Sequence, residues 1–184
     1  TTYYKWTGHP ETTPTAGFST YSTPVQPSQD GLRDLWYYSI DNYTNQEQTK
    51  VLEFKIDTQH PLSTVTAPAD DSYITSGTTY TVTGTATDVS PGSKVVSVDV
   101  SPDGGTNWYA ATNTGTDFSL WEYIWTLPGN GTYTIKSRAT DEAGNIETPG
   151  VGNSVTIDMT PPTVVSVDPL NGSVGVANAA NVYA

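Results

Sequence analysis

The sequence lacks cysteine, which excludes disulfide bonds, thiolate metal ligands and thiol catalysis. Positive charge is scarce, because 7 Lys and Arg stand against 19 Asp and Glu and leave a formal net charge of −12. Nucleic acids and anionic membranes are bound through clustered cations, so neither is an expected partner. No apolar run is long enough for membrane insertion. The acidic surface instead favours solubility and offers oxygen ligands to a divalent cation.

Helical periodicity is also missing, since no window of a dozen residues carries an apolar stripe at helical spacing. Alternation is common instead: Val96, Val98 and Val100 are separated by polar residues. The 16 Gly and 13 Pro mark frequent turns between such stretches. These patterns predict an all-β chain with short strands.

A long internal repeat organises the chain. Residues 30–42 and 130–142 align without a gap, and both the turn glycines and the strand-end aspartates recur 100 positions apart, as Gly31 with Gly131 and Asp41 with Asp141. Both copies then reach a proline linker. A unit of about 100 residues with short strands is typical of an immunoglobulin-like β-sandwich of about seven strands.

The repeat divides the chain into one complete and two partial units. Residues 61–160 form the complete immunoglobulin-like sandwich, residues 1–60 the C-terminal part of a preceding unit, and residues 161–184 the first strands of a following one. An unfinished sandwich exposes its core and its strand edges. Two explanations stay open: a longer array covers these ends, or the tail of one chain completes the first unit of the next by strand donation, which would build a head-to-tail filament.

Several motifs resemble bacterial immunoglobulin-like repeats, which occur in tandem in large secreted and cell-surface proteins. The resemblance is carried by Arg138–Asn145 and by the linkers Ile56–Pro61 and Ile157–Pro162. It implies an extracellular or cell-surface location. The stretch Ser101–Trp108 is similar to the C-terminal immunoglobulin-like domain of sulfite-oxidase-type enzymes. Nothing here supplies the molybdenum domain of those enzymes, so that likeness implies a fold and no activity.

Acidic residues near the predicted junctions have two interpretations. Asp41 and Asp141 each end a strand before a tight turn, where a carboxylate can hold the turn by accepting backbone N–H bonds. Alternatively, loops meeting at one end of the sandwich supply oxygen ligands for Ca²⁺, which would stiffen the joint. The predicted calcium residues are Asp57, Asp88, Asp141 and Asn145, with Asp158 in the role of Asp57 at the next junction.

Aromatic residues and sequons give further binding hypotheses. Trp6, Trp36 and Tyr37 are candidate ligand-binding residues that could stack on glycans, although aromatic residues also build sandwich cores. Trp6 and Trp36, in the incomplete unit, are expected to be the most exposed. Glycosylation sequons begin at Asn42, Asn130 and Asn171.

No arrangement of residues predicts catalysis. The two histidines, His9 and His60, precede prolines in expected loops, and we expect neither a metal site nor a catalytic dyad from them. Nucleophile elbows and phosphate-binding loops are missing from the sequence. We therefore expect a non-catalytic structural module of a stalk, fibre or surface filament, with itself or neighbouring domains as partners. The alternatives are an adhesive or carbohydrate-binding module and an accessory domain of a large secreted enzyme.

Overall fold

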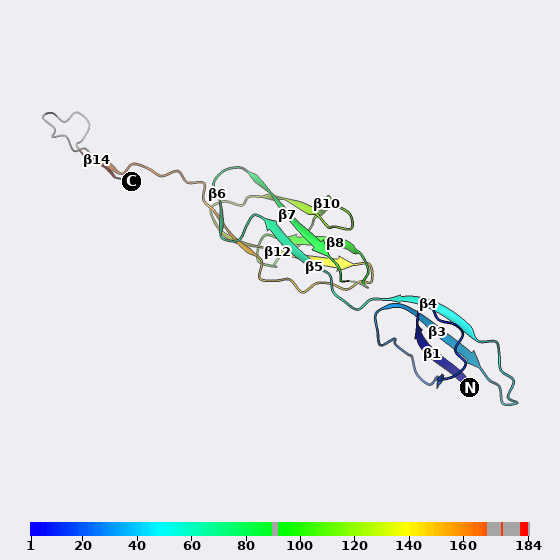
Figure 1. Cartoon of the computed structure of the whole chain (residues 1–184). Coiled ribbons are helices and arrows are strands. Elements are labelled where there is room, and N and C mark those ends of the chain that lie inside the picture. Colours follow the sequence, from blue (N-terminus) through cyan, green and yellow to red (C-terminus); the bar gives the residue numbers. More distant parts are fainter. Residues whose placement is uncertain (90–91, 169–173, 175–180, 184) are drawn as a thin grey trace.

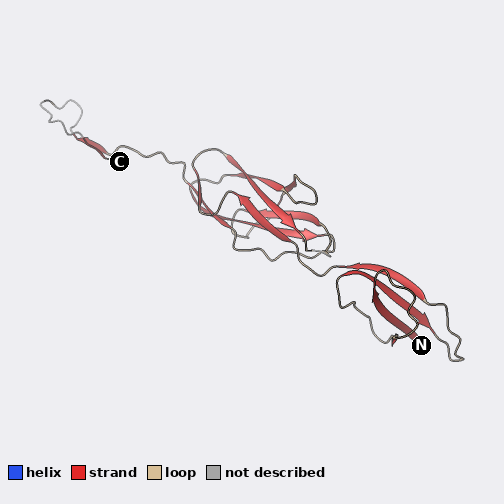
Figure 2. Cartoon of the chain, viewed as in Figure 1, coloured by secondary structure: helices blue, strands red, loops and turns tan. Residues whose placement is uncertain are grey.

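The computed structural model describes residues 1–89, 92–168, 174 and 181–183, and this part of the chain contains strands and no helix (Figure 2). The predicted all-β immunoglobulin-like fold is confirmed. The chain runs through a small sheet, a sandwich and a short two-stranded pair, one after another along an extended body (Figure 1).

Residues 62–157 form a sandwich of two sheets. One sheet has the order β10 (Thr112–Asn113), β11 (Trp121–Thr126), β7 (Thr79–Thr87), β5 (Leu62–Ala67). The other has the order β6 (Ser72–Ile74), β13 (Asn153–Ile157), β12 (Gly131–Asp141), β8 (Val95–Ser101), β9 (Tyr109–Ala110). Only β6 and β13 pair in parallel among these strands. Alternate residues of most strands point into one shared core, as the sequence periodicity predicts. In β8 the prediction is wrong for Val96, which is 43 % exposed, while Val95 is buried at the register shift opposite Thr140 and Asp141.

That core is closely packed and dominated by apolar side chains. Its most deeply buried members, all at most 1 % exposed, are Val82, Val98, Val100, Trp121, Ile135, Ala139, Val155 and Ile157. Gly84 of β7 lies against this core, and an added Cβ would collide with the Trp121 ring and the Thr64 carbonyl oxygen. The glycine therefore lets strand and indole approach closely.

The first unit consists of a single sheet. Its order is β2 (Ser19–Thr20), β1 (Thr2–Gly8), β3 (Gly31–Ser39), β4 (Lys50–Ile56). By the repeat, β3 and β4 correspond to β12 and β13 of the sandwich, and β1 takes the place of β8. Within the described residues, no second sheet packs against this one, so the face that should be core is open.

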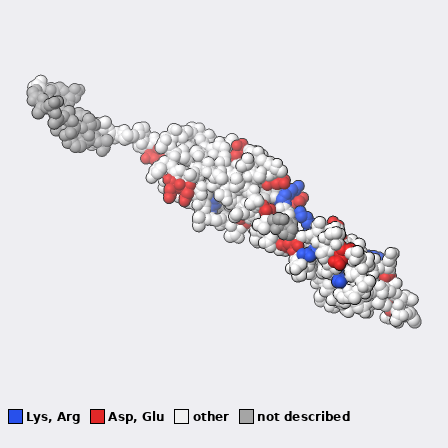
Figure 3. Space-filling model, viewed as in Figure 1, with Lys and Arg blue, Asp and Glu red and all other residues white. Residues whose placement is uncertain are grey.

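Beyond the sandwich, the chain continues into β14 (Ser166–Asp168), which pairs antiparallel with β15 (Asn181–Tyr183). Val164 and Val165, just before β14, are 62 % and 78 % exposed. Acidic and basic side chains are mixed on the face shown in Figure 3, where the cations gather over the first unit and its contact with the sandwich.

Candidate functional site

Three carboxylates meet where the first unit joins the sandwich. Asp57 lies in the linker after β4, Asp88 directly follows β7, and Asp141 ends β12. One oxygen from each lies within 4.8 Å of the others. A groove of about 430 Å³ opens beside Asp88 of this junction cluster. The structure thus brings together three of the residues predicted to bind calcium.

The hydrogen bonds of the junction cluster leave one oxygen atom without a partner. The Asp57 carboxylate accepts bonds of 2.6 Å from both the backbone N–H and the hydroxyl of Ser93. Asp141 is 1 % exposed and accepts two bonds of 2.8 Å from Asn145. Asp88 accepts one bond from the backbone N–H of Val89, while its Oδ2 atom is buried without a hydrogen-bond partner. Buried oxygens of this kind are normally satisfied.

The electrostatics of the junction cluster favour a cation. Burial raises the pKa of Asp88, and the neighbouring carboxylates Asp57 and Asp141 raise it further. Burial acts in the same direction on Asp57, but hydrogen bonds from Ser93 and Gln59 outweigh it and lower the pKa of that group. Several negative oxygens are therefore held close together in a partly desolvated place, where a divalent cation would relieve their repulsion.

The other two predicted calcium residues lie differently. The Asn145 amide nitrogen donates to the Asp57 carbonyl oxygen at 3.2 Å and to Asp141, so Asn145 presents a donor and positions the cluster. Asp158 follows β13 at the far end of the sandwich, where it accepts the backbone N–H of Thr160. Asp41 repeats the turn of Asp141, since Asn45 donates to it twice at 2.9 Å. The turn-holding interpretation therefore fits both copies of the repeat.

The aromatic candidates are less exposed than expected. Trp36 is only 7 % exposed, and its indole N–H donates to the Thr7 hydroxyl at 3.0 Å. The expectation that Trp36 is exposed is therefore wrong, because the segment that follows β1 returns across this face and places Phe18 against Tyr38. Trp6 and Tyr37 are half-buried on the opposite, open face.

The sequon asparagines occupy different surroundings. Asn42 is exposed in the turn after β3. Asn130 is also exposed, but its amide nitrogen donates to the Thr160 hydroxyl at 2.6 Å and its oxygen accepts the Met159 N–H. A glycan on that nitrogen would disturb the contact with the outgoing linker. Asn171 lies outside the described residues.

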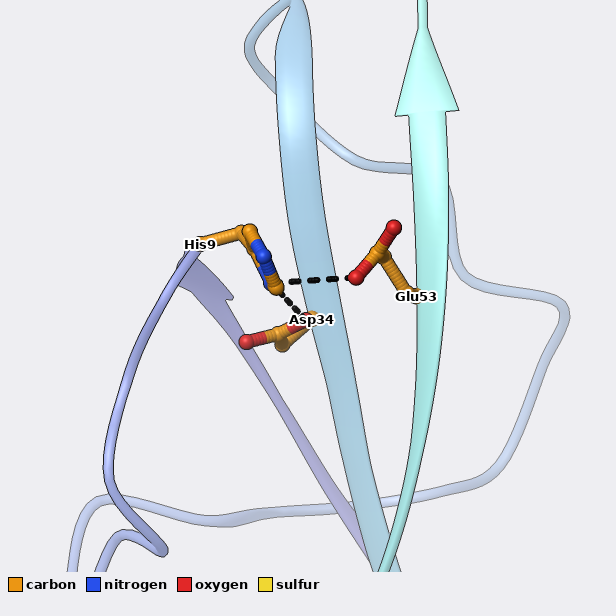
Figure 4. Close-up of side chains that lie close together, drawn as sticks. All are labelled: His9, Asp34 and Glu53. Atoms are coloured by element: carbon orange, nitrogen blue, oxygen red, sulfur yellow. Dashed lines mark hydrogen bonds and ion pairs between the residues drawn. The ribbon is translucent and has the colours of Figure 1, made fainter.

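Two clusters of polar side chains were not predicted from the sequence. His9 lies beside Asp34 and Glu53, at 3.0 Å and 3.3 Å, in a second cluster of potential metal ligands (Figure 4). Glu147, 7 % exposed, accepts bonds from the backbone and hydroxyl of Ser63 and from the backbone of Ala139. Register could have revealed the first grouping, because Asp34 and Glu53 are direct partners across β3 and β4.

Comparison with known protein families finds a match within the sandwich. Residues 61–136 match the family model described as bacterial Ig domain. No curated protein matches the chain. Among the described residues, no helix is long and apolar enough to cross a membrane.

Solved structures with similarity to the chain include an enzyme and a module. The sulfane dehydrogenase SoxCD of Paracoccus pantotrophus is 23 % identical over 63 % of this chain and 31 % of its own, with a TM-score of 0.42. Fibronectin(III)-like modules of CbhA from Clostridium thermocellum are 25 % identical over 53 % of this chain and 94 % of theirs, with a TM-score of 0.38. The chain therefore spans less than a third of the dehydrogenase chain.

Proposed function

We propose that this chain is an extracellular structural module of a stalk or surface filament, in which the tail of one copy completes the first unit of the next. The immunoglobulin-like domain supports a non-catalytic module. The observation that carries the proposal is the open apolar face of the first unit, which corresponds by the repeat to a face fully buried in the sandwich.

Equivalent positions on the two copies support an incomplete first unit. Ile135 and Val155 are 0 % exposed in the sandwich core. Their counterparts are Leu35, which is half-buried, and Phe54, which is 38 % exposed. The open face contains a hollow of about 230 Å³, lined by Thr2, Tyr4, Tyr21, Val25, Leu35, Tyr37 and Leu52. Exposed apolar surface of this kind marks an interaction site.

Part of the border of the hollow aligns with the second sheet of the sandwich. Tyr21 and Val25 are 100 positions before Trp121 and Trp125 of β11, and they border the hollow on the open face. Residues 21–26 nevertheless form no strand. By the repeat, β5, β6 and β7 have no counterpart in the first unit, and β5 and β7 are an antiparallel pair.

The tail of the chain contains a pair of the same kind. In the sandwich, Ala67 of β5 pairs with Thr83 of β7. In the tail, Val167 of β14 pairs with Val182 of β15, within one residue of the register that the repeat predicts. The tail therefore supplies counterparts of β5 and β7, two of the strands that the first unit lacks, and strand addition to an open unit is a known mode of recognition.

A polar contact would set the register of the donated strand. In the sandwich, Glu147 receives hydrogen bonds from Ser63 of β5. The repeat-equivalent Glu47 is partly exposed and pairs with Lys50 at 2.6 Å. One hundred positions after Ser63 stands Thr163, which also carries a hydroxyl. We therefore assign Glu47 as the acceptor for Thr163 of the incoming copy, with Val165 entering the apolar hollow.

The junction cluster has a supporting part in this proposal. A Ca²⁺ ion held by Asp57, Asp88 and Asp141 would tie the linker to two loops of the sandwich. Such an ion would fix the angle between the first unit and the sandwich and stiffen the array.

A peptide in trans tests the donation directly. A labelled peptide of residues 161–184 is titrated onto a chain that ends at residue 160, and we expect saturable binding. Leu35→Asp places a charge on the open face and should weaken binding at least tenfold. Ile124→Asp is the matched control, because Ile124 is an exposed apolar residue of the sandwich. Equal binding by both variants, or no binding to the parent chain, would contradict strand donation.

A further inference from the structure

We propose that His9, Asp34 and Glu53 form a Zn²⁺ site on the outer face of the first unit's sheet. Asp34 comes from β3 and Glu53 from the neighbouring β4, and both side chains point toward the imidazole of His9, which follows β1 (Figure 4). The site is separate from the junction cluster, and its ligand set is of a different chemical kind.

The distances between the ligand atoms suit a tetrahedral ion. The Nδ1 atom of His9 lies 3.0 Å from Oδ1 of Asp34 and 3.3 Å from Oε2 of Glu53. Two ligands at about 2.0–2.1 Å from Zn²⁺ in tetrahedral geometry are about 3.3 Å apart. All three atoms lie within 4.8 Å of one another. Small side-chain movements would therefore place one ion in contact with all three ligands.

The charges at this position call for a cation. Asp34 and Glu53 are direct cross-strand partners, and like charges in that relation destabilise a sheet. The Asp34 side chain is only 6 % exposed, which makes its charge costly without compensation. In the sandwich, the equivalent partners are Thr134 and Ser154, which are uncharged. The paired carboxylates are thus a property of the first unit and no general requirement of the fold.

The mixture of ligands selects the ion. One imidazole nitrogen with two carboxylate oxygens suits Zn²⁺, whereas Ca²⁺ is bound by oxygen ligands alone. The side chains of His9 and Glu53 are 30 % and 55 % exposed, so an ion from solution can reach them and a water molecule can occupy the fourth position. Bound Zn²⁺ would attach the segment after β1 to both β3 and β4 and would stabilise the half-open unit.

Isothermal titration calorimetry with ZnCl₂ on the full chain at pH 7.5 tests the site. We expect one Zn²⁺ per chain and a higher melting temperature with Zn²⁺ present. His9→Gln should weaken binding at least a hundredfold, because it removes the only nitrogen ligand. Glu53→Gln should weaken Zn²⁺ binding at least tenfold, and because Glu53 is exposed, this substitution should leave the fold intact. CaCl₂ should give no heat of binding at this site. This control uses the Asp88→Asn variant, so that Ca²⁺ binding at the junction cluster does not contribute heat.

The second histidine is the matched control, because the chain has only two. His60 is exposed in the linker, and His60→Gln should leave Zn²⁺ affinity and stoichiometry unchanged. Circular dichroism of each variant without metal verifies that the sheets are formed. Absence of Zn²⁺ binding to the parent chain would overturn the proposal and leave a protonated His9 as the partner of the two carboxylates. Binding that survives His9→Gln, or that is lost in His60→Gln, would overturn it as well.

Discussion

Truncation of two equivalent apolar residues, one in each copy of the repeat, should lower the free energy of unfolding by very different amounts. Ile135 is completely buried in the sandwich core, so Ile135→Ala removes three carbon atoms from a packed site and leaves a cavity. Such changes cost about 4 kcal/mol. Leu35 is its counterpart on the open face and is only half-buried. Leu35→Ala should therefore destabilise the first unit by about 1 kcal/mol, because only the buried part of the removed side chain loses its favourable transfer free energy.

Native-state hydrogen exchange with mass spectrometry can measure both effects in one chain. For exchange through cooperative opening, protection of β12 should fall by about a thousandfold in Ile135→Ala, and protection of β3 by about fivefold in Leu35→Ala. The measurement is made on dilute, monomeric protein. An equal loss in the two strands would refute the reasoning, since it would mean that the first unit already has a closed core. A small loss in β12 would contradict the close packing of the sandwich.

Three further perturbations have defined outcomes. Gly84→Ala should destabilise the sandwich by about 3 kcal/mol in urea denaturation, because the new methyl group collides with a neighbouring strand and with Trp121; an unchanged midpoint would contradict the close approach. Ca²⁺ at a hundredfold excess over its dissociation constant should raise stability by about 2.7 kcal/mol, and Asp88→Asn should abolish the effect in thermal melts; a calcium-independent melting temperature would exclude the junction site. Hydrogen bonds from the Asn107 backbone, from Ser101 and from the Asn107 side chain lower the pKa of Asp103 to about 2. Its folded pKa lies below the unfolded value, so its contribution to stability is complete above about pH 4 and is lost as pH falls toward 2; Asp103→Asn and the parent should differ in melting temperature at pH 6 and converge at low pH.

Much of the fold could be predicted because its signals are periodic. Alternation correctly predicted Val98 and Val100 of β8 as inward residues. It was wrong for Val96, which is 43 % exposed, because the register shifts between Thr140 and Asp141 and Val95 takes the buried position. The hundred-residue repeat made β3 and β4 equivalent to β12 and β13, and their pairing agrees. The same repeat correctly paired Asp41 with Asp141 as turn residues.

The remaining features depend on tertiary contacts between distant segments. Trp36 is buried because the segment after β1 folds back over the outer face, and no local pattern signals that return. His9 reaches Asp34 for the same reason, across 25 positions of sequence. The role of Glu147 becomes evident only when Ser63 of β5 is placed beside it, because a single buried carboxylate has no periodic signature.

The most direct test of the account is negative-stain electron microscopy with light scattering on the purified 184-residue chain over a range of concentrations. The account predicts filaments whose length grows with concentration and which vanish when residues 161–184 are deleted or when Leu35→Asp charges the open face. A chain that stays monomeric at every concentration, with the first unit still open, would contradict self-assembly by strand donation.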